Sequence, residues 1–585
     1  MDERRESCED IIYSEEYRNY LIKYDNDLQG VYANVQPDCV NIINSQFLVA
    51  YKRIQPGESI YAYTYNSVPK CFGLMDMTAV EAVGADLVAR LPGLQLSGKQ
   101  VLIGFVDTGI DYTNPLFVSP DGKTRIECIW DQNQSTERED ISYEPASGKK
   151  IFNYGREYTG DDINRALNSD DPASVVPSVD EIGHGTFLAS VAAGGYDEKN
   201  NFIGIAPESG IAVVKLKQVK RNLRDYMLIN ENAACYGEDD IILGVRYLIS
   251  KAVELGRPLV ICLGLGSSQG DHSGRTNLEQ YFDTISGLRG ICIVTAGGNE
   301  LGFAGHYSGN KGVYGEDGSQ DMEITISDMD RGFVMEVWGK APDLLRIDVI
   351  SPTGERLGDI SPVQNGRKET NFIYEGTKVT VDNVVVESGT GDQLYIMRFE
   401  RPSRGIWTVR VATFNNTSGA DFDAWIPIHQ FLNSDVRFVR PDPDITLCAP
   451  GNARGSITVS GYNHVSNSLY INSGRGFTRK DMIKPDITAP AVEVYGAFTG
   501  NSITGQSLFT RMSGTSVGAA LTAGGIALIL EWALIERNNP AISTEIIRQM
   551  LIRGSRRLTN VEYPSKAWGW GILDLYGAFG AIRYM

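Results

Sequence analysis

Apolar and polar residues follow different patterns along successive parts of this 585-residue chain. Near the N-terminus, "SQFLVAYKRI" and "IYAYTYN" have the pattern of strands, and "MTAVEAVGADLVARL" has apolar residues at helical spacing. The stretch that follows, "LPGLQLSGKQ", contains proline and glycine and has no periodicity. We therefore predict a small α+β unit over residues 1–96 that ends in a linker.

From residue 97 the pattern changes to apolar strands that alternate with helices. "VLIGFVD", "GIAVVKL", "PLVICLGLG" and "GICIVTAGG" are continuous apolar runs, and the amphipathic stretch "DIILGVRYLISKAVELG" lies between two of them. Strands that are apolar along their whole length are typical of a parallel sheet with helices on both faces. The pattern predicts an α/β domain in two parts, residues 97–318 and 436–585.

Between these parts, residues 319–435 contain short alternating stretches such as "MEITI" and "GIWTVRVATF", separated by turn sequences like "SPTGE". No helical pattern intervenes, which predicts an inserted antiparallel β-sandwich of jelly-roll-like type. Residues 319–435 contain no candidate for a catalytic triad, so we expect the sandwich to support catalysis and not to perform it. The longest apolar run, Val517–Leu530, is shorter than the roughly 20 residues of a membrane span and predicts a core helix.

Composition narrows the possible functions. Lys and Arg number 54 against 73 Asp and Glu, a net charge of -19, and no basic block interleaves with aromatics, so no nucleic-acid partner is expected. The charged N-terminus lacks the apolar segment of a secretory signal, which favours a chain made and kept in the cytoplasm. The eight cysteines are scattered without a CxxC pair, and we expect reduced, mostly buried thiols.

Three short stretches carry candidate chemistry. "FVDTGID" places Asp107 at the end of a strand, "EIGHGTFLAS" places His184 between glycines, and "SGTSVGAA" places Ser516 at the start of a helix. A serine hydroxyl needs a base to take its proton, and the base needs an acid to fix its tautomer. Each stretch alone is compatible with a turn or a helix cap, but their joint order of Asp, His and Ser is specific.

With this order the sequence resembles the subtilisin-like serine peptidases, or subtilases. "VTAGGNE" is similar to the family's oxyanion segment, and the resemblance implies that the Asn299 amide donates to the oxyanion. "CLGLG" resembles the strand that pairs with the substrate backbone, and "KPDITAP" and "GWGILDLYGA" are also family-like. The substrate-binding residues that the resemblance implies are Gly264, Leu265, Gly266, Ala296, Gly297 and Gly298.

The sequence departs from the family pattern in two places. The family usually has Met-Ala and then a proline after the nucleophile, whereas this chain has Val517–Leu521 without a proline, which concerns helix packing more than chemistry. In addition, 77 residues separate Asp107 from His184, with a polar insert over residues 131–150 that we expect to shape an added surface.

The N-terminal unit, the insert, "SSQGDHSG" and the sandwich together resemble the clostridial Csp germination proteases. This resemblance implies a prodomain that assists folding, self-cleavage, a place in the spore, and activation of the precursor of a cortex-lytic hydrolase. We expect the cut between Leu91 and Gln100, after which the cleaved prodomain stays bound as a partner. The same family has pseudoprotease members, but all three triad positions are intact here, which favours an active enzyme that cuts a protein substrate.

Two alternatives stay open. One is a non-catalytic signalling or scaffold protein in germinant sensing, and the other is a general intracellular subtilisin, which the sandwich and the long insert argue against. No cofactor is expected. The remaining histidines, at 272, 306, 429 and 464, have no metal-ligand spacing, and no acidic loop has EF-hand spacing, so no calcium site is assigned.

Overall fold

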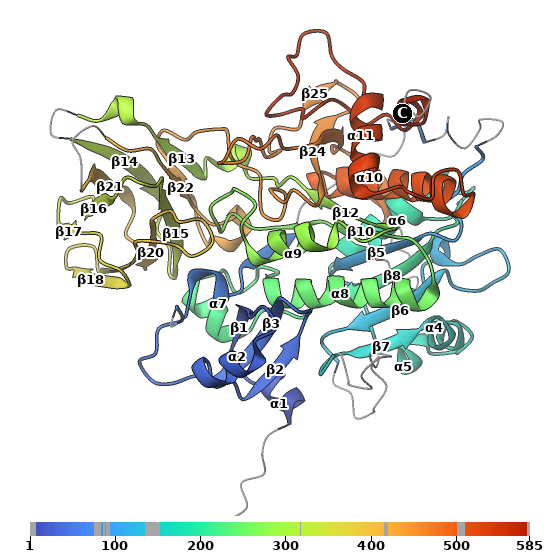
Figure 1. The fold of residues 1–585 in the computed structure, drawn as a ribbon, viewed down its shortest axis with the longest axis horizontal. Helices are drawn as coiled ribbons and strands as arrows, with labels where there is room; N and C mark the ends of the chain where they lie inside the picture. Colours follow the sequence, from blue (N-terminus) through green and yellow to red (C-terminus); the bar gives the residue numbers. More distant parts are fainter. Residues whose placement is uncertain are drawn as a thin grey trace, which may run out of the picture.

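The computed structural model describes residues 7–61, 63–74, 83–85, 88, 94–134, 152–315, 318–414, 419–499 and 509–581. A central sheet with helices on both faces lies beside a separate β-sandwich, and the N-terminal unit packs beneath helix α8 (Glu238–Leu255) (Figure 1). The predicted α/β class is confirmed, and the structure also contains a small antiparallel sheet near the N-terminus and two further antiparallel sheets between the two parts of the α/β domain.

In its described residues, the N-terminal unit has a three-stranded antiparallel sheet in the order β1-β3-β2 and two short helices. Its elements are α1 (Cys8–Tyr13), β1 (Tyr17–Lys23), α2 (Leu28–Asn34), β2 (Cys39–Ile42) and β3 (Phe47–Arg53). The strand predicted at "IYAYTYN" is wrong: this stretch forms turns and the 3₁₀ turn η1 (Tyr65–Ser67). The rings of Tyr61 and Tyr65 contact Tyr226 and Trp338 outside the N-terminal unit, whereas Tyr63 packs on Tyr20 of β1. The helix predicted at "MTAVEAVGADLVARL" falls largely outside the described residues.

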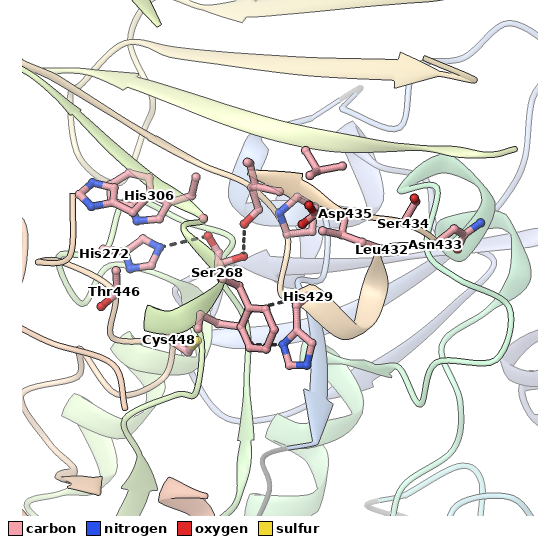
Figure 2. Close-up of a pocket in the computed structure, with 17 residues that line it drawn as sticks. Ser268, His272, His306, His429, Leu432, Asn433, Ser434, Asp435, Thr446 and Cys448 are labelled. Atoms are coloured by element: carbon pink, nitrogen blue, oxygen red, sulfur yellow. Dashed lines mark hydrogen bonds and ion pairs between the residues drawn. The ribbon is translucent and has the colours of Figure 1, made fainter. Parts of the chain in front are cut away.

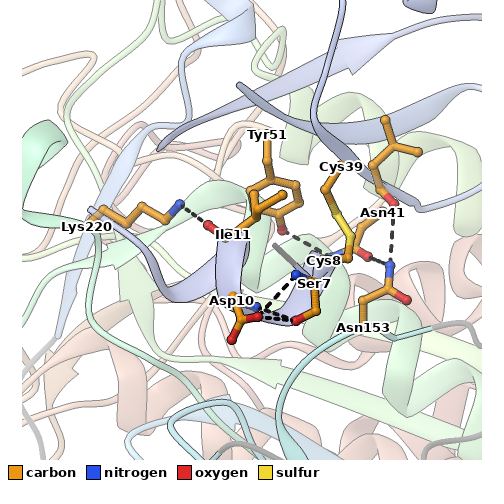
Figure 3. The surroundings of a disulfide bond; sticks show 10 residues. Ser7, Cys8, Asp10, Ile11, Cys39, Asn41, Tyr51, Asn153 and Lys220 are labelled. Atoms are coloured by element: carbon orange, nitrogen blue, oxygen red, sulfur yellow. Dashed lines mark hydrogen bonds between the residues drawn. A yellow bond between two sulfur atoms is a disulfide. The ribbon is translucent and has the colours of Figure 1, made fainter. Parts of the chain in front are cut away.

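Cys8 and Cys39 form a disulfide, with their Cα atoms 5.5 Å apart, that joins α1 to β2 (Figure 3). The expectation of reduced thiols throughout is therefore wrong for this pair. The sequence held no signal for it, because the contact depends on how α1 packs against the sheet. The other six cysteines are buried free thiols, as expected. Burial raises the pKa of Cys128 to about 12, so this thiol stays protonated at neutral pH.

The central sheet has the order β25-β24-β12-β10-β5-β8-β6-β7, with β26 paired to β24. Apart from the antiparallel edge strands β7 and β25, its strands are parallel. Alternate residues of β5 face opposite cores: Ile103 and Phe105 pack with helices α6 and α10, whereas Leu102 and Val106 pack with α8. The strands are β5 (Leu102–Asp107), β6 (Ile126–Asp131), β7 (Arg156–Thr159), β8 (Gly210–Lys215), β10 (Leu259–Leu263), β12 (Ile291–Ala296), β24 (Ile457–Asn463), β25 (Ser468–Leu469) and β26 (Ile487–Pro490).

Helix α10 (Thr515–Leu530) carries the candidate nucleophile Ser516 as its second residue and is buried along its whole length. With the turn that follows, the segment Thr515–Ile535 is apolar and long enough to span a membrane, but 83% of its most apolar window is buried inside the protein. It is the predicted core helix. The other helices are α4 (Gly160–Leu167), α5 (Pro172–Val175), α6 (His184–Ala193), α7 (Arg221–Tyr226), α9 (Asn277–Ile285), α11 (Thr544–Gly554) and α12 (Leu575–Ala581), and β27 (Val494–Ala497) and β28 (Phe509–Met512) form a hairpin.

The sandwich packs a six-stranded sheet, β13-β22-β15-β20-β19-β18, on a five-stranded sheet, β17-β16-β21-β14-β23. Every second residue of β14 (Ser319–Ile326) is buried, which confirms the alternation seen in the sequence. Strands β13 (His306–Gly309) and β23 (Val436–Phe438) lie outside the predicted bounds of 319–435. The remaining strands are β15 (Gly332–Gly339), β16 (Leu345–Ile350), β17 (Arg356–Ile360), β18 (Gly366–Phe372), β19 (Thr377–Val384), β20 (Leu394–Glu400), β21 (Gly405–Thr413) and β22 (Phe422–Trp425).

Candidate active site

The three predicted triad residues lie at the ends of core elements. Asp107 is the last residue of β5, His184 the first of α6, and Ser516 the second of α10, and all three are at most 5% exposed. His184 Nδ1 is 2.7 Å from Asp107 Oδ1. A carboxylate in this contact accepts, so Nδ1 carries the proton and Nε2 is the basic nitrogen.

Gly264 packs against both His184 and Ser516. A Cβ built on this glycine would lie 2.9 Å from His184 Cε1 and 3.0 Å from Ser516 Cβ. Distances this short leave no room for a side chain, so only glycine allows the strand to pass this close to both residues. The three stretches, far apart in the sequence, therefore meet at the start of the strand that the sequence assigned to substrate.

Local hydrogen bonds orient the acid and the base. Asp107 Oδ1 also accepts from the backbone N–H of Thr108, at 2.8 Å. Before α6, the buried Asp180 accepts from the backbone N–H groups of Gly183, at 2.8 Å, and Thr186, at 3.0 Å. Asp180 thus fixes the loop that presents His184. Sequence reasoning missed this residue, although an acid four positions before the histidine in "DEIGHG" was a signal for it.

Asn299 is held next to the nucleophile by its side-chain oxygen. Its Oδ1 accepts from the backbone N–H of Thr515 at 3.0 Å and lies 3.2 Å from the Thr515 hydroxyl. A backbone N–H can only donate, so the carboxamide oxygen of Asn299 faces Thr515. The amide Nδ2 therefore points away from Thr515 and can donate to another group. Gly298 has φ of +97°, and a Cβ there would lie 2.6 Å from Cys448 Sγ, which requires glycine. Burial raises the pKa of the Cys448 thiol, so it is not a competing thiolate at neutral pH.

The substrate strand predicted at Gly264–Gly266 is occupied. Strand β11 (Leu265–Gly266) pairs antiparallel with β4 (Cys71–Leu74) of the N-terminal unit, with Leu265 opposite Leu74 and Gly266 opposite Gly73. On its other edge β4 pairs with β9 (Tyr236–Gly237). A segment of the chain itself thus forms the middle strand of three, in the manner of strand addition by a bound peptide. Sequence reasoning missed β4 and β9, which are too short to give a periodic signal.

We predicted the cut in the junction between Leu91 and Gln100. The described part of this junction, from residue 94, contacts the far end of helix α10 from Ser516. The backbone N–H groups of Ser97 and Gly98 donate to the carboxylate of Glu531, at 2.8 and 2.7 Å. Glu531 follows the last residue of α10, whereas Ser516 is at its start, and a rise of 1.5 Å per residue separates them by about 22 Å. The described part of the junction, residues 94–100, thus lies away from the candidate nucleophile, and β4 instead pairs with the predicted substrate strand.

Three of the other histidines line one cavity of about 300 Å³ between the catalytic domain and the sandwich (Figure 2). The Trp425 ring stacks between His272 and His306, with ring centroids 4.1 and 4.8 Å away. Burial lowers the pKa of His272 to about 4, and both its ring nitrogens already face carbonyl oxygens.

In the part of the chain that the structure describes, no group of His, Cys, Asp and Glu residues has the arrangement of a metal site. Most of the insert at 131–150 lies outside the described residues.

Comparisons with known proteins agree with this geometry. The subtilase family model matches residues 98–419 and 439–571. The chain is 33% identical over 510 residues to subtilisin-like protease SBT2.3 of Arabidopsis thaliana, covering 75% of this chain and 56% of that protein. It is 22% identical over 560 residues to the PII-type proteinase of Lacticaseibacillus paracasei, covering 85% of this chain and 27% of that one. The chain thus spans about half or less of the length of these relatives.

Among solved structures, the fold is similar to that of the Clostridium perfringens CspB protease. The two superpose with a TM-score of 0.73 and 30% identity, covering 86% of this chain and 98% of the other. The family model matches more than half of the chain, including most of the sandwich and all three predicted triad positions. The chain therefore belongs to the subtilase family.

Proposed function

We propose that the chain is a serine endopeptidase in which Ser516 is the nucleophile, His184 the general base and Asp107 its orienting acid. The observation that carries the proposal is the contact at Gly264, which places His184 and Ser516 together while Asp107 holds the imidazole. The predicted roles rest on this geometry and on membership of the family.

The proposed mechanism follows from which atoms can donate and accept. His184 Nε2 takes the proton of the Ser516 hydroxyl as Oγ attacks the carbonyl carbon of the peptide bond, and Asp107 stabilises the imidazolium that forms. The negative charge that develops on the carbonyl oxygen is stabilised by the Asn299 amide. His184 then gives its proton to the leaving amine, and a water molecule, activated in the same way, hydrolyses the acyl-enzyme.

The first substrate that we propose is the chain itself. An antiparallel partner of β11 that continues past Leu74 would next reach Gly264, where His184 and Ser516 lie. We therefore move the proposed cut from the junction at 91–100 to a peptide bond within about three residues after Leu74. The N-terminal product would keep its β4 strand in the groove and so inhibit the enzyme.

Contacts away from the groove support a prodomain that stays bound after the cut. Asn19 Nδ2 donates to Asp239 at 2.6 Å at the catalytic domain, and the Tyr65 hydroxyl donates to Glu336 of the sandwich at 2.7 Å. Burial, with the Glu336 carboxylate, holds the pKa of Tyr65 well above its ordinary value, so the hydroxyl remains a donor. The N-terminal unit is thus tied to both other domains.

Intact-mass measurement of the wild type and Ser516→Ala tests this proposal. The wild type should give two fragments that co-purify, with the new terminus a few residues after Leu74, and the variant should remain one uncut chain. Equal cleavage of both would assign the cut to another protease. A new terminus inside residues 91–100 would restore the original position, and no cleavage in either chain would favour a non-catalytic scaffold.

We further propose that the protease activates the precursor of a spore cortex-lytic hydrolase during germination. The support is the resemblance of the sequence to the Csp germination proteases and the likeness to the Clostridium perfringens CspB protease along 98% of its chain. Because β4 is paired on both edges, by β11 and β9, a substrate must enter as an extended strand between them. This geometry favours an exposed, flexible segment of a protein as the substrate.

Incubation with a purified cortex-hydrolase precursor tests the second proposal. The wild type should remove a defined segment from the precursor, whereas Ser516→Ala should leave it intact. Denatured casein serves as the control substrate and should be cut poorly. Rapid degradation of casein, with random cuts in the precursor, would instead indicate a general intracellular subtilisin.

A further inference from the structure

The turn after Asn299 is held from the sandwich as well as from the catalytic domain. His429 begins the 3₁₀ turn η6 (His429–Phe431), which connects the sandwich strands β22 and β23. Its backbone N–H donates to Glu300 Oε2 at 2.9 Å, and its Nδ1 lies 3.1 Å from Glu300 Oε1. Glu300 directly follows Asn299, so both oxygens of the neighbouring carboxylate are bound by one residue of the other domain.

His429 contacts the same turn at a second point. Its imidazole stacks on the ring of Phe303, with centroids 3.7 Å apart and planes 8° apart. Because the Glu300 carboxylate accepts, Nδ1 of His429 carries the proton in this contact. The Glu300 side chain is 12% exposed and the His429 side chain 42% exposed, so the carboxylate end of this hydrogen bond is the more buried one. His429 also lines the cavity beside Ser268, just beyond the substrate strand β11 (Figure 2).

The catalytic domain also holds Asn299 and the backbone after it. Thr515 binds the carboxamide oxygen, and the backbone N–H of Leu301 donates to the carbonyl of Asn472 at 3.2 Å. The Thr515 contact sets the direction of the Asn299 side chain, whereas the Leu301 bond and the contact of His429 with the Glu300 side chain both restrain the backbone that follows Asn299. An oxyanion donor must lie within about 2.7 to 3.1 Å of the developing charge, so a small displacement of this backbone reduces its contribution.

We infer that His429 is a positioning residue for the oxyanion donor, through which the inserted sandwich acts on the rate of peptide-bond cleavage. The inference rests on the proposed protease function and extends it to a residue of the sandwich. Loss of the imidazole leaves the Thr515 and Asn472 contacts and the His429 backbone N–H bond to Glu300 in place, so we expect a rate loss of about tenfold, less than the 100-fold that a displacement of about 1 Å produces.

The test measures the first-order rate of self-cleavage in full-length chains made by cell-free synthesis. His429→Ala and His429→Leu, which lack the ring donor, should cleave about tenfold more slowly than the wild type, whereas His429→Asn, whose amide N–H can replace Nδ1–H, should recover most of the rate. His464→Ala is the matched control and should cleave at the wild-type rate. Melting temperatures near that of the wild type, expected because the His429 side chain is 42% exposed, would show that the variants are folded.

A double-mutant cycle separates positioning from a general structural role. In an Asn299→Ala background, His429→Ala should have less than a twofold further effect, because the donor on which His429 acts is absent. A full tenfold loss in that background, or a wild-type rate for both His429→Ala and His429→Leu, would overturn the inference alone. No self-cleavage in the wild type would overturn the proposed function and this inference with it.

Discussion

Alanine at Ser516 or His184 is expected to lower the first-order rate of self-cleavage by about 10⁶-fold, and alanine at Asp107 by about 10⁴-fold. The losses differ because nucleophile and base take part in bond making directly, whereas Asp107 acts through the 2.7 Å contact with His184 Nδ1. The three residues act as a unit, so the double variant Ser516→Ala with His184→Ala should be no slower than either single one. Time courses of cell-free synthesis, followed by electrophoresis, measure these rates.

Asp107→Asn is the matched variant for the acid. It keeps the size of the side chain, but its amide can donate to Nδ1 and so favours the tautomer that leaves Nε2 without a lone pair for Ser516. We expect it to be about as slow as Asp107→Ala. Self-cleavage of Asp107→Asn within tenfold of the wild type would contradict the assignment of Asp107, and a cut that purified Ser516→Ala makes in itself, with no other protease present, would contradict that of the nucleophile.

Asn299→Ala is expected to slow self-cleavage by about 100- to 1,000-fold, because its amide donates to charge that develops only in the transition state. Asn299→Asp is the informative comparison. It preserves the size of the side chain and both contacts of the oxygen with Thr515, yet it places an acceptor where the amide donor was.

We therefore expect Asn299→Asp to be at least as slow as Asn299→Ala, although it leaves no cavity. If Asn299→Asp cleaved at the wild-type rate, Asn299 would be a structural residue and not an oxyanion donor. If only Asn299→Ala were slow and its melting temperature had fallen, the effect would come from lost packing.

The sequence by itself determined the fold class and the members of the candidate triad. Strands such as β5 are apolar along most of their length because both of their faces are covered by helices, and Asp107 is the last residue of β5. The contexts of His184 and Ser516 are local in the same way, since each lies in the first turn of a buried helix. Features of this kind depend on neighbours in the chain, so they can be predicted from a pattern.

The tertiary structure decided which segment fills the groove, which cysteines pair and which part of the sandwich reaches the site. Strand β4 has only four residues, and its partners β11 and β9 are far away in the sequence, so its conformation is set by backbone hydrogen bonds to them and not by local propensity. The Cys8–Cys39 bond and the contact of His429 with Glu300 likewise join elements that only packing brings together. Such contacts leave no periodic trace in the sequence, because the free energy that fixes them comes from the partner surface.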